Sequence, residues 1–480
     1  MYLYPAPRAP KYVQPRSVEE CLPQARFMAK KTLSRAALGP VTQGDKILIV
    51  TYFDQDNYVK TAIAQALKEE GAKAVDFVTE HELAGKKPQL RSVEDGWVEA
   101  DRMIKALPEV AKFPLIMELG DVTEAGEALP VYLDEHPEYT GVFWGLGGRV
   151  QLRHALGRHG HKFRNNWVFN NWEELVSKAW LYPDELLRET ERLVLETIGK
   201  ASEIRITDPE GTHLEYRVKE EEALRWQMGA WESGHLFLDP LQATSQECSK
   251  VPVSPTVPPV FHDLNGVLAG TANHFGFFPR IELCFEHGLL VDVKGGGKYG
   301  QLIKGMMEQY KDIQWPGYPR RGFFWFCDSA LCMLVKAFRR TSDPFSSYWI
   351  TPNIPERNRA GVFHHGFGSR RHFGEEFDRY IKEHNLPHTH IHVHNYFTTY
   401  EVKLRTTGQW VKIADKGWLT VLDDPRVRAL AVRFGDPDEL LSYDWVPPVP
   451  GINVEGNYLS DYAPEPVRYL KMRIAENKSI

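Results

Sequence analysis

Cysteine is scarce in this sequence, and its spacing argues against two classes of protein. The chain has 5 cysteines in 480 residues, and no two of them form a CxxC pair. Small secreted proteins held together by disulfides carry a denser, even-numbered set. Zinc sites built from cysteines use closely spaced pairs. We therefore expect neither a disulfide framework nor a cysteine zinc site.

Long hydrophobic runs and an excess of basic charge are also missing. The longest apolar run, residues 322–335, contains Asp328 and is too short to cross a bilayer. The N-terminus lacks the apolar stretch of a secretory signal. The net charge is -6, whereas a general nucleic-acid binder needs a basic surface. We expect a cytoplasmic enzyme with a small-molecule substrate and no membrane or nucleic-acid partner.

The first part of the chain alternates between strand and helix patterns. Residues 47–51 and 74–78 are short apolar runs typical of buried strands, and residues 57–71 between them have helical spacing. Strand, helix and strand within about 35 residues predict a parallel βαβ unit. This pattern indicates an α/β N-terminal domain.

The pattern changes after an amphipathic helix at residues 183–199. Residues 202–207 and 212–218 alternate between apolar and polar side chains, and further short strands follow. We therefore predict an α/β N-terminal domain with parallel βαβ units over residues 1–199. A strand-rich α+β metal-binding domain follows over residues 200–480.

Four histidines alternate within this second domain, at positions 388, 390, 392 and 394. On a strand, side chains two residues apart face the same side. Two imidazoles on one face can bind a divalent transition metal. In a loop the same spacing would be a solvated polar tract, whereas a strand without metal would bury polar rings. The spacing predicts a metal role for at least two of the four.

A second cluster lies at residues 359–372. An apolar strand leads into His364 and His365, then into a glycine-rich turn that carries Arg370 and Arg371. Glycines let the backbone approach a ligand closely, and paired arginines can hold a carboxylate. The alternative is that these arginines are ordinary surface charge.

Five segments spread over most of the chain carry motifs of a known family. They are a βαβ opening at residues 44–75, Gly-Thr-His-Leu at residues 211–214, Gly-His-Leu-Phe-Leu-Asp-Pro at residues 234–240, a Gly-x-x-His pattern at residues 361–368, and His-Val-His at residues 392–394. With them the chain resembles the aminopeptidase T metallopeptidases. Bacterial 2,5-dihydroxypyridine dioxygenase, a non-haem iron enzyme, resembles the same group.

The resemblance implies where the metal ligands lie. His364 and His392 match family ligands outright, whereas His235 stands in place of the first glutamate and His394 in place of the aspartate. Two metals generally need bridging anionic ligands to offset their charge. Neutral imidazoles therefore suit a single ion better. We predict His392 and His394 as ligands, with His364 or His235 completing the set.

Two further family positions differ. Arg371 stands where the family has a tyrosine, and the alignment places Ser346 at the second glutamate, which leaves that carboxylate without a counterpart. The missing carboxylate puts the two-metal peptidase chemistry in doubt and favours a changed reaction.

Three functions stay open at this point. The first is a mononuclear non-haem iron oxygenase, with Fe(II) favoured and Zn(II) possible, for a small, anionic (hetero)aromatic substrate. His365 would act as acid or base, and Arg370 or Arg371 would hold the substrate. The second is a metal-dependent hydrolase of the peptidase type with Glu232 as base. The third is a non-catalytic binding protein with a decayed site. In each case a homodimer is expected from the related enzymes.

Overall fold

The protein is represented by a computed structural model, whose described residues fall into two units. These residues are 3–10, 15–32, 37–51, 55–87, 120–145, 156–165, 168–169, 172–227, 234–238, 260–273, 276–339, 354–368, 379–381, 383–386 and 390–476. Of them, those between 11 and 90 and between 116 and 184 form the N-terminal unit. Those from residue 185 onward, together with residues 3–10, form the C-terminal unit.

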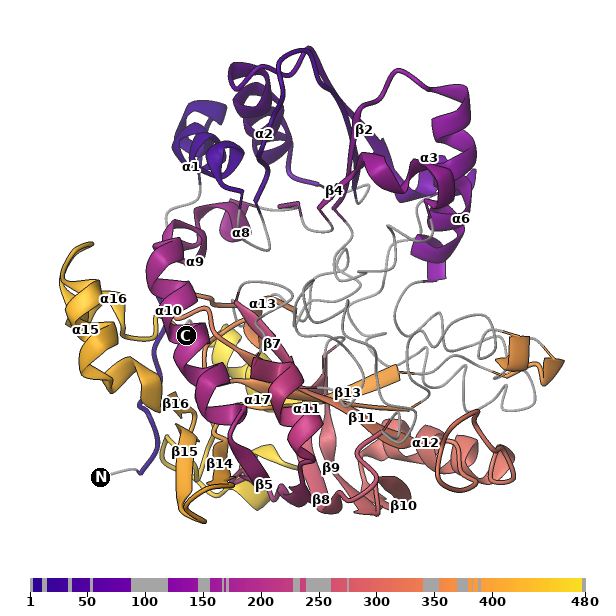
Figure 1. Cartoon of the computed structure of the whole chain (residues 1–480), viewed down its shortest axis with the longest axis vertical. Coiled ribbons are helices and arrows are strands. Elements are labelled where there is room, and N and C mark those ends of the chain that lie inside the picture. The colour runs from indigo at the N-terminus through magenta and orange to yellow at the C-terminus, as the bar shows by residue number, and fades with distance from the viewer. Residues whose placement is uncertain are drawn as a thin grey trace. The chain divides into compact units, whose positions relative to one another are not determined.

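A parallel sheet forms the centre of the N-terminal unit (Figure 1). Leu48 pairs with Asp76 on one side and with Val142 on the other, both in parallel register. The predicted βαβ unit is thereby confirmed. In sheet order, the strands are β2 Ala74–Thr79, β1 Lys46–Thr51, β3 Gly141–Trp144 and β4 Phe163–Asn165.

Helix α2, Asn57–Glu69, shows why these residues fold locally as they do. Asp56 caps the helix by accepting hydrogen bonds from the backbone N–H groups of Tyr58 and Val59. Its apolar side chains recur at helical spacing and are buried. The other helices of the unit are α1 Val18–Lys30, α3 Glu80–Ala84, α6 Gly120–Glu135, η3 Gly157–Lys162, α8 Trp172–Val176 and α9 Lys178–Leu181.

An antiparallel sheet organises the C-terminal unit and, in the described part of the chain, contains 12 strands. Along the sheet these are β13 His390–Asn395, β12 Phe363–Gly368, β11 Trp325–Cys332, β10 Leu289–Gly295, β9 Gly276–Glu286, β8 Asn265–Asn273, β6 His213–Arg217, β5 Ala201–Thr207, β14 Thr399–Leu404, β15 Trp410–Asp415 and β16 Trp418–Leu419, while β7 His235–Leu238 pairs with β11.

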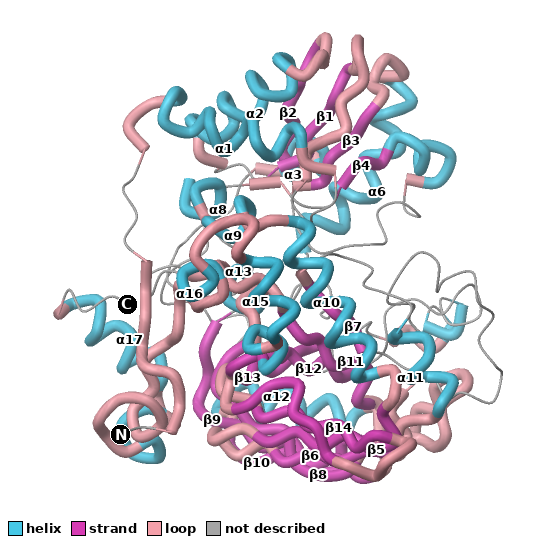
Figure 2. Tube along the Cα trace, turned by 60° about the vertical axis from the view of Figure 1, so that its left-hand side comes forward, coloured by secondary structure: helices cyan, strands magenta, loops and turns pink. Residues whose placement is uncertain are grey.

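Helices surround this sheet (Figure 2). They are α10 Asp184–Ile198, α11 Glu220–Gln227, α12 Gly297–Gln309, α13 Ile354–Arg357, η6 Thr420–Asp423, α15 Pro425–Ala431, α16 Pro437–Leu440, η7 Tyr458–Tyr462 and α17 Pro466–Ala475. The predicted fold class, an α/β part with parallel strands followed by a strand-rich α+β part, is therefore confirmed.

The core of the C-terminal unit includes both faces of strands β11 and β12. Every residue of these two strands is buried. Strands covered on both faces are expected to be continuously apolar. β11 follows this pattern except at Asp328 and Ser329, and β12 departs from it at His364 and His365. Because polar groups are costly to bury in an apolar environment, these four side chains are candidates for a functional site.

The C-terminal end of β13 is fixed by contacts to distant strands. The Asn395 side-chain amide donates to the Ala269 carbonyl at 2.8 Å and accepts from the Thr212 hydroxyl at 3.1 Å. Gly270 faces β13 so closely that a Cβ there would lie 2.5 Å from Val393 Cγ1. Asp208 accepts a hydrogen bond from the Phe397 backbone N–H. These contacts hold the histidine-bearing strand in place.

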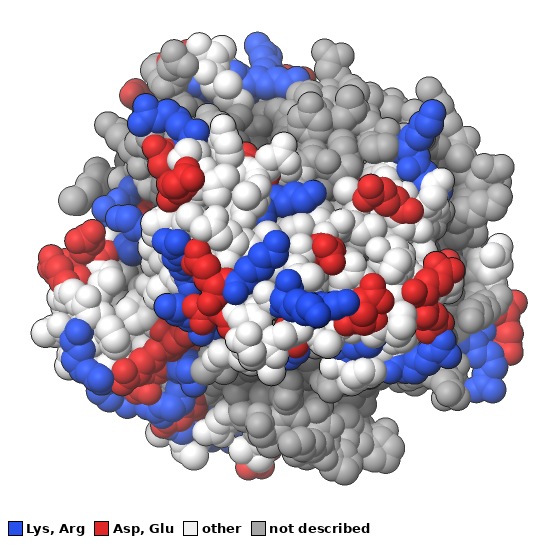
Figure 3. Space-filling view, turned by 90° about the horizontal axis from the view of Figure 1, so that it is seen from above, with Lys and Arg blue, Asp and Glu red and all other residues white. Residues whose placement is uncertain are grey.

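Surface charges of both signs are interspersed on the face drawn in Figure 3. Basic and acidic side chains of the described residues lie next to one another there instead of gathering by sign. Among the described helices, none combines the length and apolar character needed to cross a membrane.

A buried carboxylate, Glu210, lies in the turn between β5 and β6. Its side chain accepts hydrogen bonds from the Thr271 hydroxyl at 2.8 Å and the Tyr458 hydroxyl at 2.9 Å. Burial, followed by the negative charge of Asp208, raises the pKa of Glu210 to about 8. The ordinary value in an unfolded chain is 4.5. The folded state therefore keeps this proton where the unfolded state loses it, and stability falls as pH rises through this range.

We expect Glu210→Gln to remove this pH dependence. The amide keeps the acceptor oxygen but does not ionise. The stability of the variant relative to the wild type should therefore increase by roughly 3 kcal/mol between pH 5 and pH 8. Chemical unfolding at several pH values measures the difference. Glu215→Gln, at an exposed position of β6, is the control variant for the same measurement. A Glu210→Gln effect that is constant across pH would contradict the assignment.

Candidate metal centre

The register of neighbouring strands brings a set of metal-binding side chains to one face of the large sheet. His364 of β12 pairs with Ala330 of β11 and with His394 of β13. Side chains at facing positions point to the same side, as do those two residues apart on one strand. The face of His364 therefore also holds Asp328, Cys332, His235, His392 and His394.

His364 lies at the centre of this set. Its Nδ1 is 3.4 Å from His235 Nε2, and the two rings are nearly parallel, with 13° between their planes. The centroid of its ring is 5.2 Å from that of His392 and 6.1 Å from that of His394. The four histidines predicted as ligands thus lie together, although they come from three strands and from positions up to 159 residues apart.

Asp328, His364 and His392 form one compact group of donors. One ligand atom of each lies within 4.8 Å of those of the other two, and all three residues are buried. Gly366 stands between Asp328 and His392 in the strand register. Because Gly366 has no side chain, the two flanking donors can converge over it. Two imidazoles and one carboxylate are a donor set that suits a divalent ion such as Fe(II).

A second compact group consists of His235, Cys332 and His364. It meets the same 4.8 Å limit and is equally buried. The two groups share His364, so the ring lies between a carboxylate on one side and a thiol on the other.

His394 is oriented by a buried carboxylate. Its Nδ1 lies 2.9 Å from Glu356 Oε1, and Glu356 also accepts hydrogen bonds from Arg339 and the Tyr396 hydroxyl. Burial alone would raise the pKa of Glu356, but the charge of Arg339 and these hydrogen bonds hold it below its ordinary value. Burial lowers the pKa of His394. A neutral His394 that donates from Nδ1 carries its lone pair on Nε2, the tautomer that a metal ligand needs.

His365 lies on the opposite face of β12, because adjacent residues of a strand point to opposite sides. Its Nδ1 is 3.0 Å from the Ser329 hydroxyl, and its ring lies between Phe326 and Phe363. Burial lowers the pKa of His365 to about 3. The structure therefore does not bring this residue to the face of His364, where the predicted acid or base would be needed.

Several predicted residues lie outside the described part of the chain. They are Glu232, Ser346, Arg370, Arg371 and His388; the side chain of His390 is likewise not described. Their predicted roles remain predictions.

Three residues of the centre were not singled out as site residues from the sequence. Asp328 is the only charged residue between Gly322 and Val335, and a lone carboxylate in a buried strand needs a partner. The structure places this carboxylate on the face of His364. Cys332 has no neighbouring cysteine, so the spacing argument missed it. Glu356 gave no local signal, because its partners are distant in sequence.

We expect Glu356→Gln to destabilise the C-terminal unit. The substitution leaves the buried guanidinium of Arg339 without its counter-charge, and breaking such a pair costs about 3 to 5 kcal/mol. Glu203→Gln, which removes a partly exposed ion pair with Lys403, should cost about 1 kcal/mol or less. Urea unfolding of both variants provides the comparison. Equal losses would show that the Glu356 network contributes no more than a surface pair.

Comparisons with known proteins give two structural likenesses. The structure of 2,5-dihydroxypyridine dioxygenase from Pseudomonas putida KT2440 matches with a TM-score of 0.43 and 13% identity, over 84% of this chain and 98% of that one. Wild-type AmpT from Thermus thermophilus matches with a TM-score of 0.40 and 15% identity, over 84% and 99%. No family model and no curated protein matches the sequence.

Proposed function

We propose that this protein is a mononuclear non-haem iron oxygenase whose metal is held by Asp328, His364 and His392. The observation that carries the proposal is the convergence of these three buried side chains, with one donor atom of each within 4.8 Å of the others. The proposal keeps His364 and His392 from the predicted ligand set and adds Asp328. His235 and His394 lie beside the triad on the same face.

The donor chemistry fits such an ion. Two imidazoles and one carboxylate on one side of Fe(II) leave its other positions open, which is the arrangement found in iron oxygenases. When bound, the ion would supply the redox chemistry and the open positions for oxygen and substrate. Asp328 would offset one of its two positive charges in a site from which burial excludes water.

The surrounding residues would prepare the site for this ion. Glu356 holds His394 in the tautomer with a lone pair on Nε2, and Arg339 fixes the position of Glu356. Gly366 keeps space open between Asp328 and His392. The pairing of β12 with β13 places His364 and His392 before any ion binds, which reduces the entropy lost on binding.

The substrate class rests on the sequence. Arg370 and Arg371 follow β12 within three residues of its end at Gly368 and carry the charge that a small, anionic (hetero)aromatic substrate would require. The resemblance to the iron dioxygenase points to the same class. A homodimer remains the proposed assembly, which light scattering of the purified protein would test.

A metal-dependent hydrolase is the second candidate, and one observation favours it. His235, Cys332 and His364 form a second donor group next to the first. Two adjacent ions are an arrangement found in aminopeptidases. In this reading Glu232, two residues before Gly234, would serve as the base.

The metal content and reaction of the protein distinguish the two candidates. Protein purified without oxygen should contain one iron per chain and should consume oxygen with hydroxylated aromatic acids. Asp328→Asn and His392→Gln should each weaken iron binding by at least roughly tenfold and abolish oxygen uptake, because each removes a donor. His213→Gln, at an exposed position of β6, is the control and should leave both unchanged. Two zinc ions per chain with peptide cleavage would favour the hydrolase and overturn the oxygenase.

A further inference from the structure

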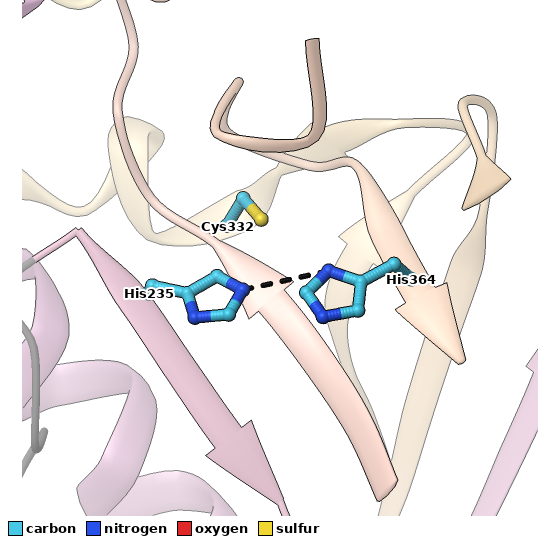
Figure 4. Close-up of side chains that lie close together, drawn as sticks. All are labelled: His235, Cys332 and His364. Carbon is cyan, nitrogen blue, oxygen red and sulfur yellow. Dashed lines mark hydrogen bonds between the residues drawn. The ribbon is translucent and has the colours of Figure 1, made fainter. Parts of the chain in front are cut away.

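His235, Cys332 and His364 form a donor group of a different chemical character from the proposed iron site. The three side chains come from β7, β11 and β12 and converge as Figure 4 shows. Each of them is fully buried, with an exposed fraction of 0%. The group contains two imidazoles and a thiol, whereas the first group contains two imidazoles and a carboxylate.

The backbone fixes this group from both sides. Cys332 pairs directly with His235 across β11 and β7. The Gly234 backbone N–H donates to the buried carboxylate of Glu191, and its carbonyl accepts from Met333 N–H at 2.9 Å. Cys332 is further tied to the segment before β12, since its N–H donates to the Val362 carbonyl at 3.1 Å. The donors are therefore placed by regular strand pairing and not by flexible loops.

The spacing of the two imidazoles matches that of two ligands on one ion. Two nitrogens bound at 2.0–2.1 Å and separated by a tetrahedral angle lie about 3.3 to 3.4 Å apart. The distance between His235 Nε2 and His364 Nδ1 is 3.4 Å. A hydrogen bond between the rings also accounts for this distance, so the thiol of Cys332 is the feature that separates the two interpretations.

We propose that Cys332, His235 and His364 form a site for a thiophilic divalent ion such as Zn(II), distinct from the Asp328 site. Thiolate ligands select soft and borderline ions, whereas carboxylates suit harder ones. His364 binds this ion through Nδ1, the nitrogen that lies 3.4 Å from His235 Nε2. Binding converts the Cys332 thiol to a thiolate, and the proton passes to solvent. If the other nitrogen of His364 holds a second ion at the same time, the proton on that nitrogen also passes to solvent.

The Cys332 site is additional to the iron site of the proposed oxygenase. The two sites have only the side chain of His364 in common. An ion at the Cys332 site needs neither Asp328 nor His392. The thiolate of Cys332 would favour Zn(II) over Fe(II) at this site. The carboxylate of Asp328 would keep its preference for a harder ion at the other site. The two sites can therefore be tested separately, by substitutions at Cys332 and at Asp328.

Cobalt(II) provides the test, because thiolate coordination gives it an intense near-ultraviolet charge-transfer band that nitrogen and oxygen ligands do not give. Full-length protein freed of metal by a chelator is titrated with cobalt(II) under reducing, oxygen-free conditions. In the wild type the band should develop as one cobalt ion per chain fills the Cys332 site. Cys332→Ser should lose it and bind cobalt at this site at least roughly tenfold more weakly.

Two matched variants complete the experiment. Cys327→Ser alters another buried cysteine of β11, whose thiol donates to the Trp325 carbonyl at 3.1 Å, and it should keep the band. Asp328→Asn should also keep the band while losing iron, so failure of the iron site and failure of the thiolate site give different results. Cys332→Ser should further release one proton fewer per cobalt ion bound at that site.

A wild-type measurement keeps the proposal testable if Cys332→Ser does not fold. X-ray absorption of the zinc-loaded wild type should show a sulfur neighbour at about 2.3 Å in addition to nitrogen at about 2.0 Å. Absence of the band and of this sulfur would overturn the proposal and leave His235 and His364 as a hydrogen-bonded pair. A band that survives in Cys332→Ser, or that disappears in Cys327→Ser, would place the thiolate on another cysteine and would overturn it equally.

Discussion

The pairing register of β11, β12 and β13 is the constraint on which the candidate metal centre depends. His364 faces Ala330 on one side and His394 on the other, and this pairing decides which side chains share its face. A slip of β13 by one residue would turn His392 and His394 to the face of His365. The slip would also exchange buried apolar side chains for polar ones. The hydrogen bond from Asn395 to Ala269 and the close approach at Gly270 oppose it.

The polar groups on this face would be costly to bury without compensation. Taking a charged carboxylate and a guanidinium out of water costs several kcal/mol for each ion. Glu356 and Arg339 recover part of this cost from each other, and His394 and Tyr396 add hydrogen bonds to the same carboxylate. The resulting network has an electrostatic consequence, since it fixes which nitrogen of His394 carries the lone pair. Stability and site preparation therefore depend on the same contacts.

Because His364 belongs to two donor groups, the two parts of the centre offer different kinds of metal ligand. The carboxylate of Asp328 lies on one side and the thiol of Cys332 on the other, and both are held by β11. The two nitrogens of one imidazole influence each other, because a bond at one changes the basicity of the other. A sheet that offers hard and soft donors around a single ring can thus discriminate between ions by geometry and ligand type.

The sequence by itself determined the class of the fold and part of the site. Short periodic patterns revealed the βαβ unit and the strand-rich second part, since side-chain periodicity is a local property. The alternation of His392 and His394 placed them on one face, and the family motifs added His364 and His235. Strand alternation also separates His364 from His365, although the sequence argument gave His365 a role in the same site. The fold class and the central histidines were therefore accessible from residue order.

Only the tertiary structure decided which distant side chains complete the centre. Asp328 and Cys332 reach His364 because β11 lies between β7 and β12, and Glu356 reaches His394 from a separate helix. Strand periodicity tells which way a side chain points, but it does not tell which strand lies beside it. That neighbour is set by pairing between segments tens of residues to nearly one hundred residues apart, and such pairing is determined by packing of the whole sheet.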